Sequence, residues 1–212
     1  MNLKTYYQKR ANEYDLVYQK PERQNDLKRL HGFLESAFKK QRVFEIACGT
    51  GYWTQTIAKV CKSIVATDIN QEVLAIAQKR DYGIAAVVFE ALDFWQLKTG
   101  RTKFDGLFGG FIWSHILIEK LPQFLNLLEA TIRSEGQIIF MDNKYVAGSS
   151  TPIARRDELG NTFQIRKLKD GTQYEVLKNF PSEEAIKTLI SPIGWKMEWI
   201  ELEYFWVLKL KK

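Results

Sequence analysis

The sequence predicts an α/β domain built on a doubly wound, mostly parallel sheet, and three observations support that prediction. Short apolar runs rich in strand formers alternate with amphipathic segments over the first two thirds of the chain, as they do where helices join parallel strands. Two glycines, Gly49 and Gly51, follow the first such run directly. The next run, residues 63–68, ends in the acid Asp68. A strand, a glycine turn and a helix in this order are typical of nucleotide-binding domains.

The expected elements follow in chain order from residue spacing. Apolar side chains recur every three to four residues within residues 1–40, which predicts helices interrupted at Pro21. The expected strands of the main sheet are Val43–Ala47, Ile64–Asp68, Ala85–Phe89, Phe104–Phe111 and Gln137–Met141. The helices expected between them are Thr54–Lys59, Gln71–Lys79 and Leu121–Ile132, the last followed by a turn at residues 134–136.

The last third of the chain departs from this alternation. Residues 169–171, Lys-Asp-Gly, separate two strand-like runs, Thr162–Leu168 and Thr172–Phe180, and predict a β-hairpin. Ser182 is expected to cap a short helix that ends at Ile190. Two antiparallel strands are then expected at Trp195–Leu202 and Tyr204–Leu210. Because no repeat, low-complexity tract or linker interrupts the chain, one domain is predicted.

Composition narrows the class of protein. The chain has 212 residues, of which 45% are hydrophobic and 13% aromatic, enough for one sizeable core. No run approaches 18 apolar residues, so no membrane span is expected. Two cysteines are too few for a disulfide framework or a zinc cluster, which favours a reducing, cytoplasmic setting and no bound metal. The net charge of +6 is mild for this length and comes partly from the lysines of the tail.

The glycine turn and the acid that follows point to an adenosine-like ligand. Glycines allow the backbone to approach a ligand where a Cβ would collide. Asp68 lies at about the spacing, roughly 20 residues, from which an acid can hydrogen-bond ribose hydroxyls. A dinucleotide fingerprint has a third glycine three residues after Gly51, but Thr54 stands there, behind the bulky Tyr52 and Trp53. A pyrophosphate would therefore find little room.

The same residues resemble the first motif of the class I S-adenosylmethionine-dependent methyltransferases, E/D-x-x-C-G-x-G, since Glu45, Cys48, Gly49 and Gly51 match it. The resemblance spans about residues 43–210. It implies S-adenosylmethionine as the cofactor and a Rossmann-like, mostly parallel seven-stranded sheet with an antiparallel C-terminal strand pair. In that family the turn holds the methionine part, the acid after the second strand holds the ribose, and a later acid, here Asp93, meets the adenine. The residues expected to contact the cofactor are Arg10, Tyr14, Glu45, Ala47, Gly49, Gly51, Asp68, Ile69, Asp93 and Phe94.

The resemblance also divides the chain into parts. Residues 1–40 resemble the helical lid that small-molecule members place over the cofactor, residues 43–142 form the cofactor-binding core, residues 143–180 are a loop and hairpin insertion, and residues 181–212 close the domain. In the lid, Arg10 suits a carboxylate because a guanidinium fork can grip it bidentately. An amphipathic helix with buried tyrosines and a surface arginine is the alternative there, and for Asp93 the alternative is a helix N-cap.

Acceptor-binding residues are expected in two places. His115 follows the fourth strand, where open α/β sheets expose their working loops, and its titration near neutrality suits a general base. The polar stretch after the fifth strand offers Asn143, Arg155 and Arg156, and the paired arginines suit an anionic group. Tyr6 of the lid completes the residues expected to contact the acceptor. The alternatives are a structural histidine and a solvated surface loop.

These expectations lead to a function. We expect methyl transfer from S-adenosylmethionine to a small molecule that bears an anionic group such as a carboxylate or phosphate, by in-line displacement. The accepting atom stays open among oxygen, nitrogen, sulfur and carbon, and the oligomeric state stays open too. The alternatives are a nucleic-acid or protein methyltransferase, disfavoured because Gly109-Gly110-Phe111-Ile112 stands where such enzymes carry Asn-Pro-Pro-aromatic, and a non-enzymatic adenosine-cofactor binding module.

Overall fold

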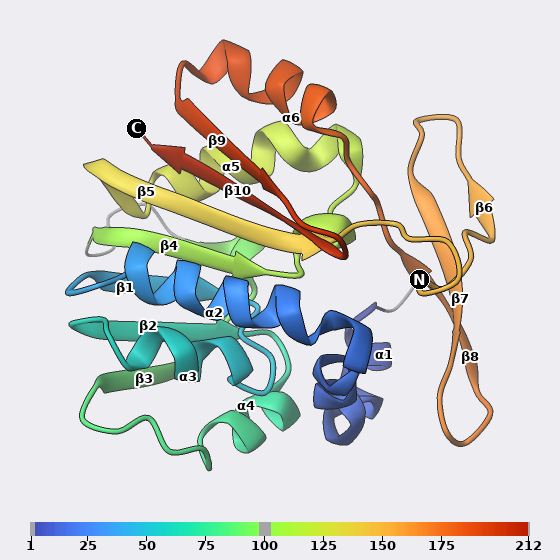
Figure 1. Ribbon diagram of the computed structural model, residues 1–212, viewed down its shortest axis with the longest axis horizontal. Coiled ribbons are helices and arrows are strands. Elements are labelled where there is room, and N and C mark those ends of the chain that lie inside the picture. The colour runs from blue at the N-terminus through green and yellow to red at the C-terminus, as the bar shows by residue number, and fades with distance from the viewer. Residues whose placement is uncertain (1–2, 98–102, 212) are drawn as a thin grey trace.

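The computed structural model describes residues 3–97 and 103–211. Seven strands form the main sheet in the order β3-β2-β1-β4-β5-β10-β9 (Figure 1). Their bounds are β1 Arg42–Ile46, β2 Ser63–Asp68, β3 Ala86–Ala91, β4 Phe104–Gly110, β5 Ile132–Asn143, β9 Lys196–Glu201 and β10 Phe205–Lys211. Neighbours among β1 to β5 pair in parallel, whereas β10 pairs antiparallel with both β5 and β9. The mostly parallel seven-stranded sheet with an antiparallel C-terminal pair is confirmed.

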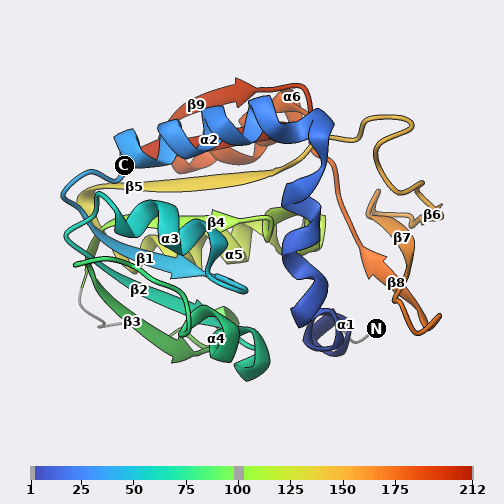
Figure 2. The same ribbon diagram turned by 60° about the horizontal axis from the view of Figure 1, so that its bottom comes forward.

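Helices cover both faces of this sheet, as Figure 2 shows from a second direction. The α-helices are α1 Leu3–Lys9, α2 Gln24–Ala37, α3 Tyr52–Ala58, α4 Gln71–Ala77, α5 Leu121–Glu129 and α6 Glu183–Ile190. Apolar side chains of α2 and α3 pack with Val43 and Phe108 in one cluster. Those of α5 and α6 pack with Phe44 and Leu107 in another. Because successive side chains of a strand point to opposite faces, each central strand contributes side chains to both of these clusters.

The predicted turn at residues 134–136 is wrong, because those residues lie inside the long strand β5. The ladder between β4 and β5 pairs Phe104 with Ile132 but then Gly106 with Gln137, so several residues of β5 bulge outward at this point. Their exposed side chains and the glycine at position 136 are typical of a turn in sequence alone. The same strand explains why α5 stops earlier than the predicted helix, at Glu129.

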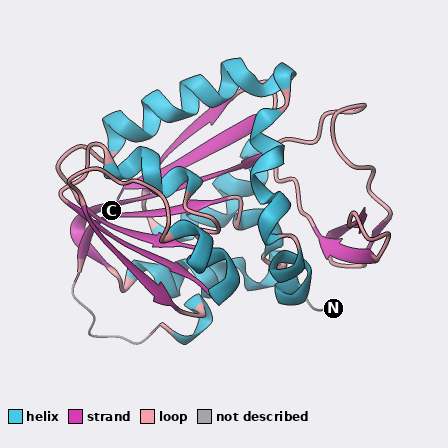
Figure 3. Cartoon of the chain, turned by 90° about the horizontal axis from the view of Figure 1, so that it is seen from below, coloured by secondary structure: helices cyan, strands magenta, loops and turns pink. Residues whose placement is uncertain are grey.

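Two segments lie beyond the carboxyl ends of the parallel strands. The N-terminal segment consists of α1 followed by the 3₁₀ helices η1 Ala11–Gln19 and η2 Pro21–Arg23. The predicted hairpin is present as β7 Thr162–Lys167 and β8 Gln173–Leu177, and β6 Arg155–Arg156 adds a short third strand to it. Figure 3 shows this small sheet projecting from one end of the domain. The helix cap at Ser182 is also confirmed, since its hydroxyl accepts from the amide of Ala185.

Four further 3₁₀ turns connect these elements: η3 Phe94–Gln96, η4 Trp113–His115, η5 Ile118–Lys120 and η6 Ser191–Ile193. Two of them, η3 and η4, follow β3 and β4 at the same edge of the sheet. None of the helices that the structure describes has the length and apolar character needed to cross a bilayer.

Candidate active site: two adjoining cavities

The first cavity, here called the cofactor cavity, lies at the carboxyl ends of β1, β2, β3 and β4 and has a volume of about 240 Å³. This is the crevice where open α/β sheets bind ligands. The glycine turn, the end of β2 and the η3 turn all contribute to it. Six residues predicted from sequence to contact the cofactor line its walls: Ala47, Gly49, Asp68, Ile69, Asp93 and Phe94.

Asp68 fixes the shape of the glycine turn. One of its carboxylate oxygens accepts from the amide of Gly49 at 2.9 Å, and the other accepts from the amide of Asn70 at 2.8 Å. Burial raises the pKa of Asp68, while these backbone hydrogen bonds oppose the rise. Each carboxylate oxygen has a second lone pair, so the side chain can still accept from a hydroxyl in the cavity.

Asn70 supplies an acceptor that sequence reasoning missed. Its side chain is only 3% exposed and lines the cofactor cavity. The side-chain oxygen is buried, and no described residue donates a hydrogen bond to it. A buried polar atom without a partner is costly. A ribose with two hydroxyl donors beside Asp68 would satisfy this atom, so the residues present fit an adenosine-type cofactor.

Two residues of the first motif, Gly51 and Glu45, do not line the cavity but support the glycine turn. Gly51 adopts φ +79° as it begins α3, and a Cβ there would collide with the hydroxyl of Tyr82. Glu45 is 2% exposed and accepts from the hydroxyl of Thr54 at 2.7 Å. Burial raises the pKa of Glu45 to about 8. Both residues therefore support the turn from below.

Asp93 caps a turn and also lies on the wall of the cofactor cavity. Its carboxylate accepts from the amide of Trp95 at 3.0 Å and so caps the η3 turn. The same residue lines the cofactor cavity next to Phe94. The N-cap and a contact with a ligand in the cavity are therefore compatible.

The N-terminal segment is tied to the glycine turn through Asp15. The hydroxyl of Thr50 donates to the Asp15 carboxylate at 2.6 Å, and Arg80 pairs with the same carboxylate. Arg80 also donates to the carbonyl of Thr50 at 2.6 Å. These bonds therefore fix the N-terminal segment to the glycine turn. The side chain of Tyr14, predicted to contact the cofactor, lies outside the described part of the structure.

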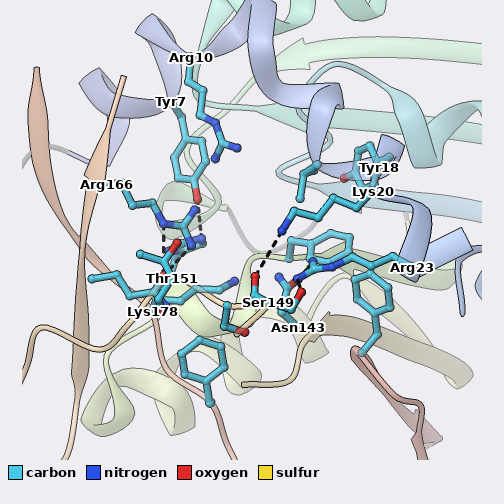
Figure 4. Close-up of a pocket in the computed structure, with 17 residues that line it drawn as sticks. Tyr7, Arg10, Tyr18, Lys20, Arg23, Asn143, Ser149, Thr151, Arg166 and Lys178 are labelled. Carbon is cyan, nitrogen blue, oxygen red and sulfur yellow. Dashed lines mark hydrogen bonds between the residues drawn. The ribbon is translucent and has the colours of Figure 1, made fainter. Parts of the chain in front are cut away.

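The second cavity, here called the acceptor cavity, has a volume of about 170 Å³ and lies between the lid, β5 and the hairpin. Among the residues that the structure describes, five cationic ones line this cavity and no aspartate or glutamate does (Figure 4). The five are Arg10, Lys20, Arg23, Arg166 and Lys178. Arg10 therefore faces this cavity and not the cofactor cavity, where it was predicted to lie.

Lys178 is the most deeply buried of the five cations. Its ammonium lies 2.7 Å from a carboxylate oxygen of Asp142 and 2.6 Å from the hydroxyl of Ser114, and its side chain is 4% exposed. Burial would raise the pKa of Asp142, but the Lys178 charge and hydrogen bond hold it below its ordinary value. Asp142 is the second-last residue of β5 and Lys178 follows β8, so this pair joins the hairpin insertion to the main sheet.

Three residues, Tyr7, Phe111 and His115, line both cavities and so mark their border. His115 Nδ1 lies 2.6 Å from the carbonyl oxygen of Leu177, which can only accept, so this nitrogen carries the proton. His115 Nε2 therefore accepts from the hydroxyl of Tyr7 at 2.7 Å. Burial, followed by the Lys178 charge, lowers the pKa of His115 to about 3, so the ring is neutral near pH 7.

The residues predicted to bind the acceptor divide into two groups. Asn143 lines the acceptor cavity. Tyr6 lines neither cavity, because it packs against Leu168 and Val176 of the hairpin and its neighbour Tyr7 faces inward instead. Arg155 forms a bidentate pair with Glu175 on the exposed hairpin surface. Both Tyr6 and Arg155 are corrections to the sequence-based site.

Arg156 also lies away from the acceptor cavity. It faces a separate groove between the hairpin base and α6, and it donates weakly to the carbonyl of Gly160. The expected arginine pair is therefore part of β6, a strand that the sequence analysis assigned to a loop. Within the residues that the structure describes, no group of three or more His, Cys, Asp or Glu side chains is arranged to hold a metal ion.

Comparisons with known proteins agree with this geometry. Residues 43–136 match a family described as a methyltransferase domain. No curated protein matches the chain in sequence. Among solved structures, DhpI in complex with SAH is 22% identical with a TM-score of 0.80, over 97% of this chain and 93% of that chain. The DhpI complex with SAM and HEP is 21% identical with a TM-score of 0.80, over 98% and 95%.

A methyltransferase from Clostridium acetobutylicum that depends on S-adenosylmethionine gives 17% identity and a TM-score of 0.65, over 97% of this chain and 98% of that chain. At these identities the similar structures establish the fold. Residues 43–136 therefore match a methyltransferase domain, and the chain has the fold of S-adenosylmethionine-dependent methyltransferases.

Proposed function

We propose that the protein transfers a methyl group from S-adenosylmethionine to a small anionic molecule held in the acceptor cavity. One observation carries the proposal: five cationic side chains, with no carboxylate among the lining residues, surround a cavity of about 170 Å³ that shares a wall with the cofactor cavity. A cavity of this size suits a small molecule. Clustered charges of one sign in a low-dielectric pocket favour a ligand of the opposite sign.

The cofactor cavity supports the first half of the proposal. Asp68 and Asn70 would hold the ribose, and Ile69, Asp93 and Phe94 would surround the adenine. The reactive end would then lie toward the border residues Tyr7, Phe111 and His115. When bound, S-adenosylmethionine supplies an already activated methyl group. The protein's main contribution is then alignment and exclusion of water, an effect with an upper range of about 7–11 kcal/mol.

The backbone conformation at the border between the two cavities is unusual for a residue other than glycine. Phe111 adopts φ +61°, in the left-handed region that aromatic residues rarely occupy. Its amide donates to the carbonyl of Met141 at 2.7 Å, which holds the chain in that conformation. Such strain persists where the surrounding structure fixes it, and it gathers at functional sites. Here it turns the chain between the two cavities.

We further propose that His115 takes up the acceptor's proton through the Tyr7 hydroxyl, which donates to its Nε2, when the nucleophile arrives protonated. Its Nε2 is unprotonated near neutral pH and lies at the border of both cavities. Burial and the nearby Lys178 and Arg166 charges make the ring a weak base without a ligand. An anionic acceptor offsets those charges and raises the pKa of His115 toward the range useful for base catalysis.

The similar DhpI structure is a complex with both SAM and HEP, which supports a fold that can hold a second ligand together with the cofactor. The test is a methyl-transfer assay with labelled S-adenosylmethionine and small carboxylates, phosphates and phosphonates, each paired with its neutral amide or ester. We expect label in the anionic member of a pair only. Label in neutral members, in nucleic acid or in protein would contradict the proposal.

A further inference from the structure

We infer that the acceptor cavity has a second anion-binding subsite at Arg23, so that the acceptor is a small molecule with two anionic groups. The inference rests on the proposed function and specifies its substrate class. Figure 4 shows Arg166 and Lys178 on one side of the cavity and Lys20 and Arg23 on the other. The two sides come from different segments, since Arg166 and Lys178 belong to the hairpin region, whereas Lys20 precedes η2 and Arg23 is its last residue.

Arg23 is a buried cation that lacks a paired anion. Its side chain is 5% exposed, yet no described carboxylate lies within 4.0 Å of its guanidinium nitrogens. Its Nε is buried, and no described residue accepts a hydrogen bond from it. Buried charges are ordinarily paired and hydrogen-bonded, because desolvation otherwise makes them costly. An anionic ligand in the cavity would supply the missing partner.

Neighbouring residues hold Arg23 in place without neutralising it. Its two terminal nitrogens donate to the Asn143 side-chain oxygen at 3.1 Å and to the Ser149 hydroxyl at 3.2 Å. The guanidinium also lies over the rings of Tyr204 and Phe205, at 5.5 and 5.6 Å from their centres. These neutral contacts fix the orientation of the guanidinium and leave its charge uncompensated, as in a site prepared for an anion.

The acid whose charge acts on Arg23 is Glu22, and it lies toward solvent. Its carboxylate is 3.9 Å from the ammonium of Lys20 and accepts from the hydroxyl of Ser149 at 3.3 Å. The Glu22 side chain is 40% exposed, so water screens its charge. Lys20 also donates to the carbonyl of Ser149 at 3.3 Å, which brings its ammonium to the same side as Arg23.

The test compares matched pairs of anions by calorimetric titration of the protein saturated with SAH. Succinate is paired with butyrate, and 3-phosphonopropionate with propylphosphonate, so that each pair differs by one anionic group. In the wild-type protein we expect the two-anion member to bind at least tenfold more tightly. Arg23→Gln should reduce that advantage to within twofold while leaving the affinity for the one-anion member unchanged.

Matched variants separate a binding role of Arg23 from a structural one. Arg29→Gln removes the same charge from an exposed position on α2 and should keep the full two-anion advantage. Arg23→Lys retains the charge and should keep part of the two-anion advantage. Unchanged SAH affinity in each variant shows that the fold is intact.

The outcomes also distinguish the inference from the proposed function. If one-anion probes bind and lose affinity in Arg166→Gln, but the wild-type protein gives no two-anion advantage, the second subsite is wrong and the proposed function stands. Equal weakening of both members of a pair by Arg23→Gln overturns the subsite as well. If no probe binds the wild-type protein with SAH present, the anionic acceptor itself is wrong.

Discussion

Lys178→Met is expected to destabilise the fold strongly, because it leaves the carboxylate of Asp142 buried without its cation. The two side chains are 4% and 0% exposed and their charged atoms lie 2.7 Å apart. Removing one partner of such a pair costs about 3–5 kcal/mol, since the remaining charge stays desolvated. For a domain of this size, about 2–4 °C of melting temperature corresponds to each kcal/mol, so Tm should fall by about 6–20 °C.

The assay is thermal unfolding of four proteins at neutral pH. Asp142→Asn added to Lys178→Met removes the uncompensated charge and should recover at least half of the lost Tm. Lys187→Met is the matched control, because Lys187 pairs with Glu183 at 2.8 Å but the side chains are 61% and 43% exposed. Such surface pairs contribute about 0–1 kcal/mol. A fall in Tm in Lys178→Met that is no larger than the fall in Lys187→Met would refute the reasoning.

Asp68→Ala removes the acceptor of two backbone amides in the cofactor cavity, so calorimetry should show SAH binding weakened by about 1–3 kcal/mol, and unchanged affinity would exclude Asp68 from the site. In the folded state the Glu45 carboxyl keeps its proton up to a pKa of about 8, whereas its ordinary value is 4.5. The stability that this protonated carboxyl contributes is therefore complete below about pH 4.5 and is lost as pH rises through 8. The Tm of Glu45→Gln should therefore rise relative to that of the wild-type protein between pH 6 and 9. If Tm changes with pH by the same slope in both proteins, the raised pKa of Glu45 is contradicted. His115→Ala should lower kcat by about 10²–10⁴-fold with SAH affinity retained, and a fully active variant would exclude His115 as the general base.

Most of the fold was predictable because it depends on local patterns. The strand ending in Asp68 and the glycines that begin α3 have signatures within a few residues. The bulge in β5 was not predictable, because residues 134–136 carry a turn composition and only the ladder with β4 shows that pairing resumes at Gln137. A long-range ladder overrides the local preference at this point.

The candidate site was predictable on the cofactor side and only partly on the acceptor side. Gly49 and Asp68 belong to one local motif and line one cavity. The acceptor cavity instead gathers cations from distant segments, such as Arg23 near the start and Lys178 after the hairpin. No spacing rule links them. The Tyr6 and Tyr7 pair shows the same limit, since helical periodicity alone does not say which of two adjacent tyrosines faces the hairpin.

A sequence signal was nonetheless present for two of the missed residues. Asn70 follows the ribose acid by two residues and directly precedes α4, so its place at the cofactor cavity is implied by that of Asp68. Arg166 lies in the hairpin strand β7, where alternation places it on the same face as Gln164. Its guanidinium donates to the Gln164 side-chain oxygen at 2.8 Å at the cavity wall.

The most direct test of the cofactor cavity is thermal unfolding of the wild-type protein and Asp68→Ala with SAM, SAH, NAD or ATP added separately. A ligand at about 100 times its Kd stabilises by about 2.7 kcal/mol, which corresponds to a rise in Tm of about 5–10 °C. We predict that rise with SAM and SAH alone, and a smaller rise in Asp68→Ala at the same concentrations. A rise with NAD in place of SAM and SAH, or SAM binding that Asp68→Ala leaves unchanged, would contradict the assignment of this cavity.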